Sequence, residues 1–302
     1  MRYIGIDVAK ATLAVFIPSQ GNLTVTNDEE GFRKLVKELK KDDVVGVEST
    51  GSYHHPLARF LIRKGFEVRE LNPIMTKQFI RATVRRKKTD KTDAVIISKL
   101  LAQGDGHPMT LKNIDNPLKK MSRVREKLVQ ARSSLKLQLQ TVELDLKVIR
   151  RSLKTLIKKY DQEIEKIDAA MLETKNEQTA ILESVPGVSP RIARSILAEL
   201  GDVKRFSNKK KITAFAGYDP KLTESGSSIH HTGKLTKRGS PYLRHVLHLA
   251  AFANTSRSNI FSDYYRKKKS EGKHFYQSMT ATARKMLEII YTLLINGEHF
   301  KP

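Results

Sequence analysis

The sequence contains no cysteine, which excludes disulfide bridges and thiolate-bound zinc sites. It also lacks any apolar run close to the roughly 20 residues that a membrane-spanning helix needs. The first apolar stretch, "MRYIGIDVAK", contains an aspartate, which does not fit an export signal. These absences predict a cytoplasmic, nucleoid-associated protein without a membrane partner.

Acidic side chains are scarce relative to basic ones. The 302 residues include 32 Asp and Glu against 56 Lys and Arg, which gives a formal net charge of +24. Residues 179–302 hold the largest excess, with 21 basic and 9 acidic side chains. Such a surface attracts phosphate-rich partners, because each neutralised phosphate releases counterions. We therefore expect the protein to bind DNA.

Residues 1–104 alternate between strand and helix patterns. Three β-rich runs are followed by an amphipathic helix, "DEEGFRKLVKELKK", whose acids lie in the first turn and whose lysines lie in the last, as the helix dipole favours. The nearly all-apolar run "DVVGVEST" is typical of a buried central strand, and a second helix and a further strand follow it. The pattern predicts an α/β domain with a mixed sheet.

Residues 105–178 have a different texture. From Met121 to Met171, apolar residues recur in steps of three or four over about seven heptads, with no proline or glycine among them. This predicts a long coiled-coil helix that either pairs with another chain or folds back as a hairpin. Because no turn signal interrupts the seam, we favour pairing, into a dimer or tetramer.

Residues 179–302 predict a mainly α domain. Two helical stretches flank Pro186, Gly187 and Val188, as in a helix-hairpin-helix, which offers backbone amides to a phosphate. Basic residues beside this turn, near later glycines and in the earlier run "RRKK" are candidate nucleic-acid contacts, although each alone also fits a solvated surface charge. They are Arg85, Arg86, Lys87, Lys88, Arg191, Arg194, Lys234, Lys237, Arg238 and Arg244.

Four acids in the first domain suggest a metal site. Asp7 lies within an apolar strand and Glu48 ends another, where an uncompensated carboxylate is costly to bury. Asp90 and Asp93 are three residues apart and share one face of a predicted helix. Carboxylate oxygens suit Mg²⁺, with Mn²⁺ as an alternative, and four of them can hold the two ions of a phosphoryl-transfer site. The non-catalytic alternatives are that Asp7 and Glu48 are salt-bridged strand residues and that Asp90 and Asp93 are ordinary acids in the first turn of a helix.

These motifs resemble one family. "GIDVAK", "VESTG" and "KTDKTDA", followed later by "AFAGYDP" and "GKLTKRGSPYLRHVL", are similar to the DEDD transposases of the insertion-sequence one-ten family. The resemblance covers nearly the whole chain in the family's domain order. It implies a ribonuclease-H/RuvC-like catalytic domain at 1–104, the helical segment at 105–178 and a carboxyl-terminal transposase domain at 179–302.

The resemblance also implies a serine nucleophile in the carboxyl-terminal domain. The family's Ser-Gly pattern places it at Ser225, with Ser227 and Ser228 as close alternatives in the loop "TESGSSIHHTGK". The neighbouring His230 and His231 rank low as its base. A composite site of metals and serine, and guidance by a structured RNA from the element, are further implications of the family.

Three other functions compete with this one. A junction-type nuclease would need the four acids and no serine. An actin-like ATPase or sugar kinase would explain "GIDVAKATLAVF", but no further glycine-rich phosphate loop is evident. A non-catalytic nucleic-acid scaffold would explain the coiled coil and the charge, but not the four acids, which would repel phosphate without a metal.

Overall fold

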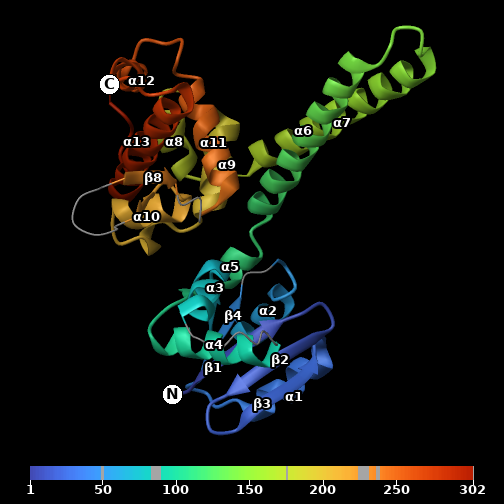
Figure 1. The fold of residues 1–302 in the computed structure, drawn as a ribbon, viewed down its shortest axis with the longest axis vertical. Helices are drawn as coiled ribbons and strands as arrows, with labels where there is room; N and C mark the ends of the chain where they lie inside the picture. The colour runs from blue at the N-terminus through green and yellow to red at the C-terminus, as the bar shows by residue number, and fades with distance from the viewer. Residues whose placement is uncertain (49–50, 83–89, 175, 224–230, 236–238, 302) are drawn as a thin grey trace. The chain divides into compact units, whose positions relative to one another are not determined.

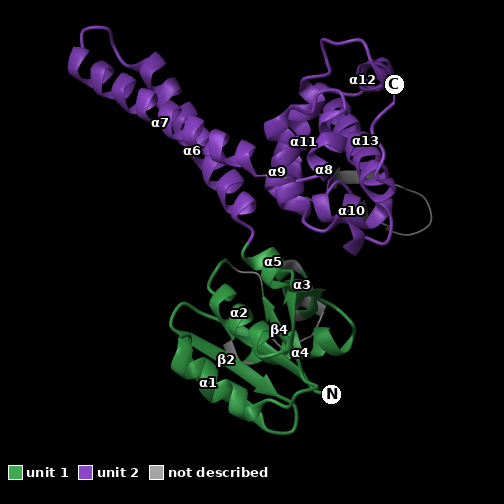
Figure 2. Ribbon diagram, turned by 180° about the vertical axis from the view of Figure 1, so that it is seen from behind, with its two compact units in different colours: residues 1–115 green, residues 116–302 purple. Residues whose placement is uncertain are grey.

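In the computed structural model the chain divides into two compact units, residues 1–115 and residues 116–302 (Figures 1 and 2). The structure describes every residue except 49–50, 83–89, 175, 224–230, 236–238 and 302. Side chains at 74, 78, 80–82, 90–91, 220–223 and 231–234 are also outside the description. Among the described residues, no helix is long and apolar enough to cross a membrane.

A six-stranded mixed sheet forms the centre of the first unit (Figure 1). The parallel pairs are β1–β4 and β4–β5, and the other neighbours are antiparallel. This confirms the predicted mixed α/β sheet. In spatial order the strands are β3 (Gly21–Thr26), β2 (Thr12–Ile17), β1 (Tyr3–Val8), β4 (Val44–Glu48), β5 (Glu67–Leu71) and β6 (His107–Pro108).

Helices cover both faces of this sheet. One face carries alternate residues such as Ile4 and Ile6 of β1, which pack in one core with Phe32 and Leu57 of two helices. The other face is covered by a helix whose Ile97 joins a second apolar cluster. The helices of the unit are α1 (Glu29–Glu38), α2 (His55–Arg63), α3 (Pro73–Ala82), α4 (Asp90–Ala102) and α5 (Leu111–Ile114).

The second unit begins with a helical hairpin of α6 (Pro117–Thr141) and α7 (Lys147–Glu173). Arg125 pairs with Asp168, and Arg132, farther along α6, pairs with Asp161, which is earlier on α7, so the helices are antiparallel. The structure thus adopts the hairpin alternative and not one continuous helix. The turn has no glycine or proline; Arg150 donates to the carbonyl of Val142 over 2.7 Å and so satisfies an end of α6.

Further helices and a strand pair complete the mostly helical second unit, as predicted. Its core gathers around α13, where Met286, Leu287 and Ile290 are fully buried. The helices are α8 (Gln178–Glu183), α9 (Pro190–Leu200), α10 (Lys209–Ala216), α11 (Pro241–Phe252), α12 (Ile260–Ser270) and α13 (Phe275–Asn296), with a short 3₁₀ helix at Val203–Arg205. Strands β7 (Pro220–Thr223) and β8 (His231–Leu235) form a separate antiparallel pair.

The predicted turn around Gly187 lies between α8 and α9. Gly187 has a φ of +83°, and a Cβ there would lie 2.2 Å from the amide nitrogen of the Asn254 side chain. Asn254 is buried and donates to the carbonyl of Pro186 over 2.9 Å. Backbone conformation and packing therefore account for this glycine, and the use of the turn as a phosphate-binding module stays a prediction.

Candidate active site

Asp7 and Glu48 lie at the carboxyl ends of two adjacent parallel strands. The register of β1 and β4 pairs Gly5 with Gly46 and Ile6 with Val47, so Asp7 and Glu48 follow at the same level. Side chains two residues apart on a strand point to the same face. Both acids therefore share the face on which Gly5 and Gly46 lie.

The two glycines explain how α4 reaches that face. A Cβ at Gly5 would lie 2.0 Å from the carbonyl oxygen of Ala94, and a Cβ at Gly46 would lie 2.4 Å from a methyl of Leu101. Only glycine allows such close contact between backbone and helix. Ser98 fixes the helix further by donating to the carbonyl of Tyr3 over 2.6 Å.

The close packing of α4 brings its first turns toward the strand ends. Asp93 precedes Ala94, the residue over Gly5, and its charge acts on Glu48 together with that of Asp7. Glu48 is only 8% exposed. Burial raises the pKa of Glu48, a hydrogen bond with Thr76 lowers it, and the negative charges of Asp7 and Asp93 raise it, leaving the pKa above its ordinary value. Three predicted acids are thus electrostatically coupled.

The fourth acid, Asp90, is the first residue of α4, but its side chain is outside the described ones. Among the described residues, no three His, Asp or Glu side chains form a group that could hold a metal ion. The donor chemistry nevertheless suits a hard cation, because carboxylates gather where their mutual repulsion disfavours ionisation. Magnesium at this edge therefore stays a prediction that fits the residues present. Arg85, Arg86, Lys87 and Lys88 also lie outside the described residues.

The predicted serine loop lies between β7 and β8. Ser225, Ser227, Ser228 and His230 are outside the described residues, and of His231 only the backbone is described. Lys237 and Arg238 also lie outside the described residues. The backbone of Lys234 is described, but its side chain is not.

The two ends of this segment are held together at its base. Arg244 donates to the carbonyl of Ala216, before the segment, and to that of Gly239, after it, each over 2.9 Å. A Cβ at Gly239 would lie 1.9 Å from the carbonyl oxygen of Phe215, so the chain passes very close there. Arg244, predicted as a nucleic-acid contact, thus closes the base of the loop in this structure.

A buried glutamate fixes the start of α11 directly after the loop. Glu199 of α9 is 2% exposed and accepts two hydrogen bonds from the Arg123 guanidinium, at 2.7 and 2.9 Å. It also accepts from the hydroxyl of Ser240, the N-cap of α11, over 2.8 Å. Burial raises the pKa of Glu199, but pairing with Arg123 outweighs it, so the pKa lies below its ordinary value. This network ties α6, α9 and α11 together.

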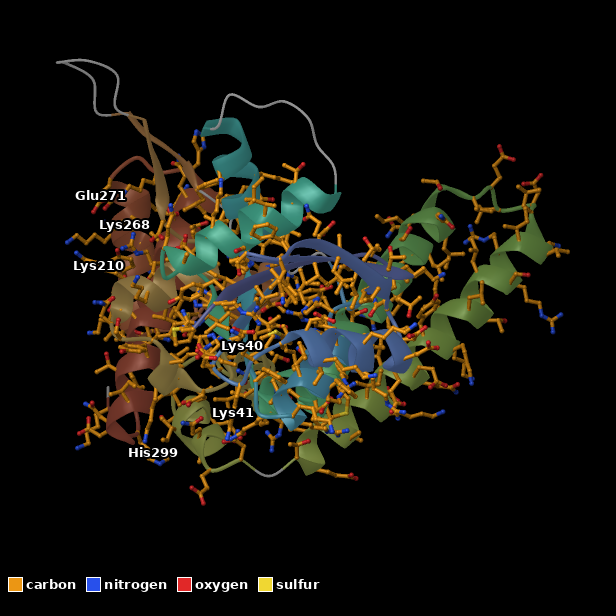
Figure 3. The ribbon with its side chains drawn as sticks, turned by 90° about the horizontal axis from the view of Figure 1, so that it is seen from below. Lys40, Lys41, Lys210, Lys268, Glu271 and His299 are labelled. Carbon is orange, nitrogen blue, oxygen red and sulfur yellow. The ribbon has the colours of Figure 1, made fainter. Side chains whose placement is uncertain are left out.

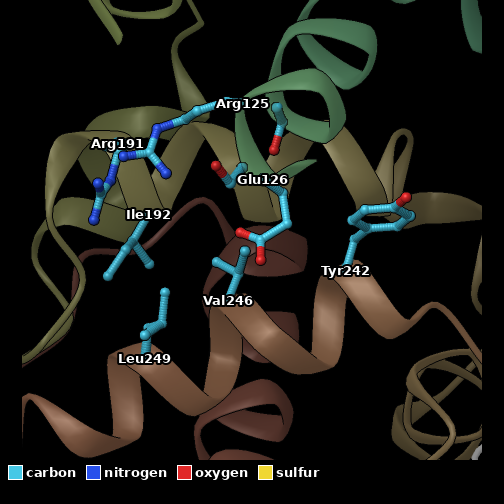
Figure 4. Close-up of a pocket in the computed structure, with 9 residues that line it drawn as sticks. Arg125, Glu126, Arg191, Ile192, Tyr242, Val246 and Leu249 are labelled. Atoms are coloured by element: carbon cyan, nitrogen blue, oxygen red, sulfur yellow. The ribbon is translucent and has the colours of Figure 1, made fainter. Parts of the chain in front are cut away.

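Arg191 and Arg194, two further predicted contacts, lie on α9. Arg191 lines a small cleft with Arg125, Glu126 and Tyr242 (Figure 4) and remains 39% exposed at its side chain. Arg194 is 13% exposed and donates to Glu183 and to the carbonyls of Pro190 and Leu172. Arg191 is thus accessible, whereas Arg194 connects the ends of α7 and α8 to α9.

Sequence reasoning missed the supporting residues. Gly5 and Gly46 each stand two positions before an acid on a strand, and that spacing is the signal that a helix packs beside the acids. Glu199 and Arg123 are 76 residues apart, and no local pattern indicates that they pair.

Comparisons with known proteins agree with this organisation. A model of DEDD transposases, described as "Transposase", matches residues 4–145, and a second, described as "Transposase IS116/IS110/IS902 family", matches residues 179–266. The chain is 26% identical over 314 residues to the "Pilin gene-inverting protein" of Moraxella bovis, covering 99% of this chain and 97% of that protein.

Two relatives from insertion elements match over shorter ranges. The "Transposase for insertion sequence element IS1111A" of Coxiella burnetii is 28% identical over 145 residues, 47% of this chain and 38% of that protein. A protein of insertion element IS110 from Streptomyces coelicolor is 30% identical over 122 residues, 40% of this chain and 30% of that protein. The family models and these relatives replace the ATPase, kinase and scaffold hypotheses. The chain belongs to the IS110 family of transposases.

Proposed function

We propose that this transposase cuts and rejoins DNA strands at the ends of an insertion element, using a metal-bound acidic site and a serine nucleophile. The relatives support the reaction class, since their names describe transposition and the inversion of a gene. Asp7, Glu48, Asp90 and Asp93 are the proposed metal ligands, and Ser225 the proposed nucleophile.

The observation that carries the acidic site is the coupling of Glu48 to Asp7 and Asp93 at the ends of adjacent strands. Glu48 is buried and Asp7 and Asp93 are half-buried, and negative charges so placed are unfavourable unless a cation or a proton offsets them. Magnesium bound there would supply positive charge to a reacting phosphate. Manganese offers the same oxygen-based chemistry. The packing of α4 against Gly5 keeps Asp93 at the sheet edge.

The serine segment supports the second half of the proposal. Arg244 and the Glu199 network fix both ends of the segment that contains Ser225. In the proposed step, the Ser225 oxygen forms a bond to a DNA phosphorus and loses its proton, while a deoxyribose oxygen leaves and takes up a proton. Ser227 and Ser228 remain alternatives for this role.

Partners beyond the element DNA are also proposals. Guidance by a structured element RNA is consistent with the net charge of +24. Association into a dimer or tetramer is supported by apolar side chains at the end of the α6–α7 hairpin, where Leu144 is 80% and Val148 79% exposed. The ten predicted basic contacts are proposed as phosphate ligands on the same electrostatic grounds. Arg194 and Arg244 would have to exchange hydrogen bonds to this chain's own carbonyls for a phosphate.

Covalent trapping tests the proposal. The purified protein is incubated with Mg²⁺, element-end DNA and the flanking transcript, and a denaturation-resistant protein–DNA adduct is sought. We expect an adduct in the wild type and at least about 100-fold less adduct in Asp7→Asn. Substituting a residue that only hydrogen-bonds to a metal ligand usually lowers activity by about 10- to 100-fold, and loss of a ligand itself should exceed that. Ser225→Ala should give none. Asp42→Asn is the matched control and should behave as wild type, because Asp42 is exposed and precedes β4, at the end of the strand opposite to Glu48.

The outcomes separate the two halves of the proposal. Strand cleavage that persists in Ser225→Ala and vanishes in Asp7→Asn would mean a junction-type metal nuclease. An adduct that moves to Ser227 or Ser228, seen by peptide mapping, would reassign the nucleophile. Full activity in Asp7→Asn would contradict the proposal that these acids form the metal site.

A further inference from the structure

The turn between α12 and α13 carries a cluster of aromatic and basic side chains that the proposed reaction does not use. Helix α12 ends at Ser270, and α13 begins at Phe275. We call its residues the lysine–aromatic surface. They are Lys267, Lys269, Lys273, His274, Phe275 and Tyr276.

The aromatic rings of this surface are unusually accessible. Tyr276 is 76% exposed and Phe275 is 40% exposed. The two rings lie edge to face with centroids 5.3 Å apart, and Phe275 lies 6.3 Å from the ring of Tyr265 on α12. Tyr265 therefore supports Phe275 from behind, while the Tyr276 ring is offered to solvent. Adjacent large apolar side chains left exposed indicate a binding surface.

A basic segment directly precedes these rings in the chain. Lys267 and Lys269 are exposed in the last turn of α12, while Lys268 and Lys273 both pair with Glu271. Figure 3 labels Lys268 and Glu271. From Arg266 to His274 the segment holds five Lys or Arg and a single acid. The first residues of α13 also lie at the positive end of a 22-residue helix dipole. Negative charge is therefore favoured beside the rings.

This combination discriminates between classes of partner. The centre of a protein–protein interface is depleted of lysine, so a second protein fits the surface poorly. Duplex DNA offers phosphates but keeps its base faces stacked inside, so it would leave Tyr276 unused. Unpaired bases stack on exposed aromatic rings while lysines follow the backbone. RNA presents such bases in loops and bulges, whereas the DNA of an insertion element is duplex until its strands are cut.

We infer that the lysine–aromatic surface binds an unpaired segment of RNA, with a base stacked on Tyr276 and the backbone held by Lys267 and Lys269. This deepens the proposed RNA-guided function by assigning it a surface. It does not depend on the acids or the serine, because binding is measured without strand cleavage.

Fluorescence anisotropy of the full chain tests the inference, with a labelled oligouridine of about 12 nucleotides. Tyr276→Ala should weaken binding about tenfold, the size of one lost stacking contact, and Tyr276→Phe should retain the wild-type affinity. Phe252→Ala, an exposed aromatic on α11 (59% exposed), is the matched control and should leave affinity unchanged. Substituting Lys267 and Lys269 by Gln should reduce the salt dependence of binding.

Two further probes decide the source of the bases. A duplex of equal length should bind Tyr276→Ala as well as wild type, and a deoxyuridine oligomer should bind wild type more weakly than RNA does. Equal affinity for the DNA oligomer would overturn the assignment to RNA. Unchanged RNA affinity in Tyr276→Ala would overturn the surface itself. RNA binding that persists when no serine adduct forms would leave this inference standing while the proposed chemistry fails.

Discussion

Glu48 in the first unit and Glu199 in the second are both buried, but the charges around them have opposite signs. Glu48 at the end of β4 is 8% exposed, and Glu199 on α9 is 2% exposed. Glu199 accepts hydrogen bonds from Arg123 and Ser240, and its pKa is lowered. Burial, and then the charges of Asp7 and Asp93, raise the pKa of Glu48.

The contrast distinguishes a carboxylate that stabilises the fold from a carboxylate that is a candidate for function. A buried carboxylate with a guanidinium and a hydroxyl is compensated within the chain and fixes neighbouring elements. Glu48 receives a hydrogen bond from Thr76 and attraction from Lys77, but burial and the charges of Asp7 and Asp93 outweigh them, so a proton or a bound cation is favoured there. Perturbed acids mark active sites in the second case far more than in the first.

The largest expected effect comes from the glycine that holds the acids together. Gly5→Ala should destabilise the first unit by about 3 kcal/mol or more, because the new Cβ would meet the backbone of α4. Gly46→Ala is the matched comparison and should cost less, about 1–2 kcal/mol, because its new Cβ would meet side-chain atoms of Leu101 and Ile97, not backbone. Urea unfolding followed by circular dichroism measures both. Equal costs would show that α4 does not depend on Gly5.

Glu199→Gln should destabilise the second unit by about 2 kcal/mol at neutral pH, less than a fully buried pair costs, because Arg123 is 40% exposed to solvent. The lowered pKa means that this stabilisation is present above the ordinary value of 4.5 and is lost as the pH falls through the folded-state pKa. The difference between wild type and variant should therefore shrink in acid. A difference that grows in acid would contradict the pairing.

Glu48→Gln should have the opposite sign and stabilise the metal-free first unit by about 1 kcal/mol near neutral pH. Because the pKa of Glu48 is raised, its contribution is most favourable below the ordinary value of 4.5 and is lost as the pH rises through the folded-state pKa. In thermal melts with EDTA, the higher stability of the variant should therefore appear only at a pH above the folded-state pKa of Glu48. Added Mg²⁺ should raise the melting temperature of wild type more than that of the variant. An equal response would argue against Glu48 as a ligand.

The smallest effect is expected at a pair that is neither fully buried nor coupled to a site. Arg132 and Asp161 join α6 and α7 at 2.6 Å but are 25% and 39% exposed. Arg132→Ala should cost less than about 1 kcal/mol, and 1 M salt should reduce that cost, because solvent screens the pair. The readout is urea unfolding at two salt concentrations. A cost matching that of Glu199→Gln would mean that burial does not separate the two classes.

Local patterns predicted much of the fold. Alternating apolar residues and a dipole-matched helix are sufficient to predict the mixed sheet, because each is a property of a short segment. The hairpin could not be predicted from the spacing of its apolar residues, since the same spacing also fits one long helix. At the turn, Arg150 donates to the carbonyls of Leu139 and Val142, contacts that form once α7 has folded back. Arg194 and Arg244 were predicted as DNA contacts from their charge and neighbours in the sequence. Their described hydrogen bonds, however, go largely to this chain's own carbonyls.

The sequence by itself determined which residues are candidates for chemistry. Carboxylates in apolar strands and at a helix start, and a large excess of positive charge, are visible without a structure. Only the tertiary structure decided which acids act on one another and which are neutralised. That decision depends on strand register, on the close approach that Gly5 and Gly46 permit, and on Arg123, far away in sequence, reaching Glu199. Coulomb energy follows distance in space, and folding alone sets that distance.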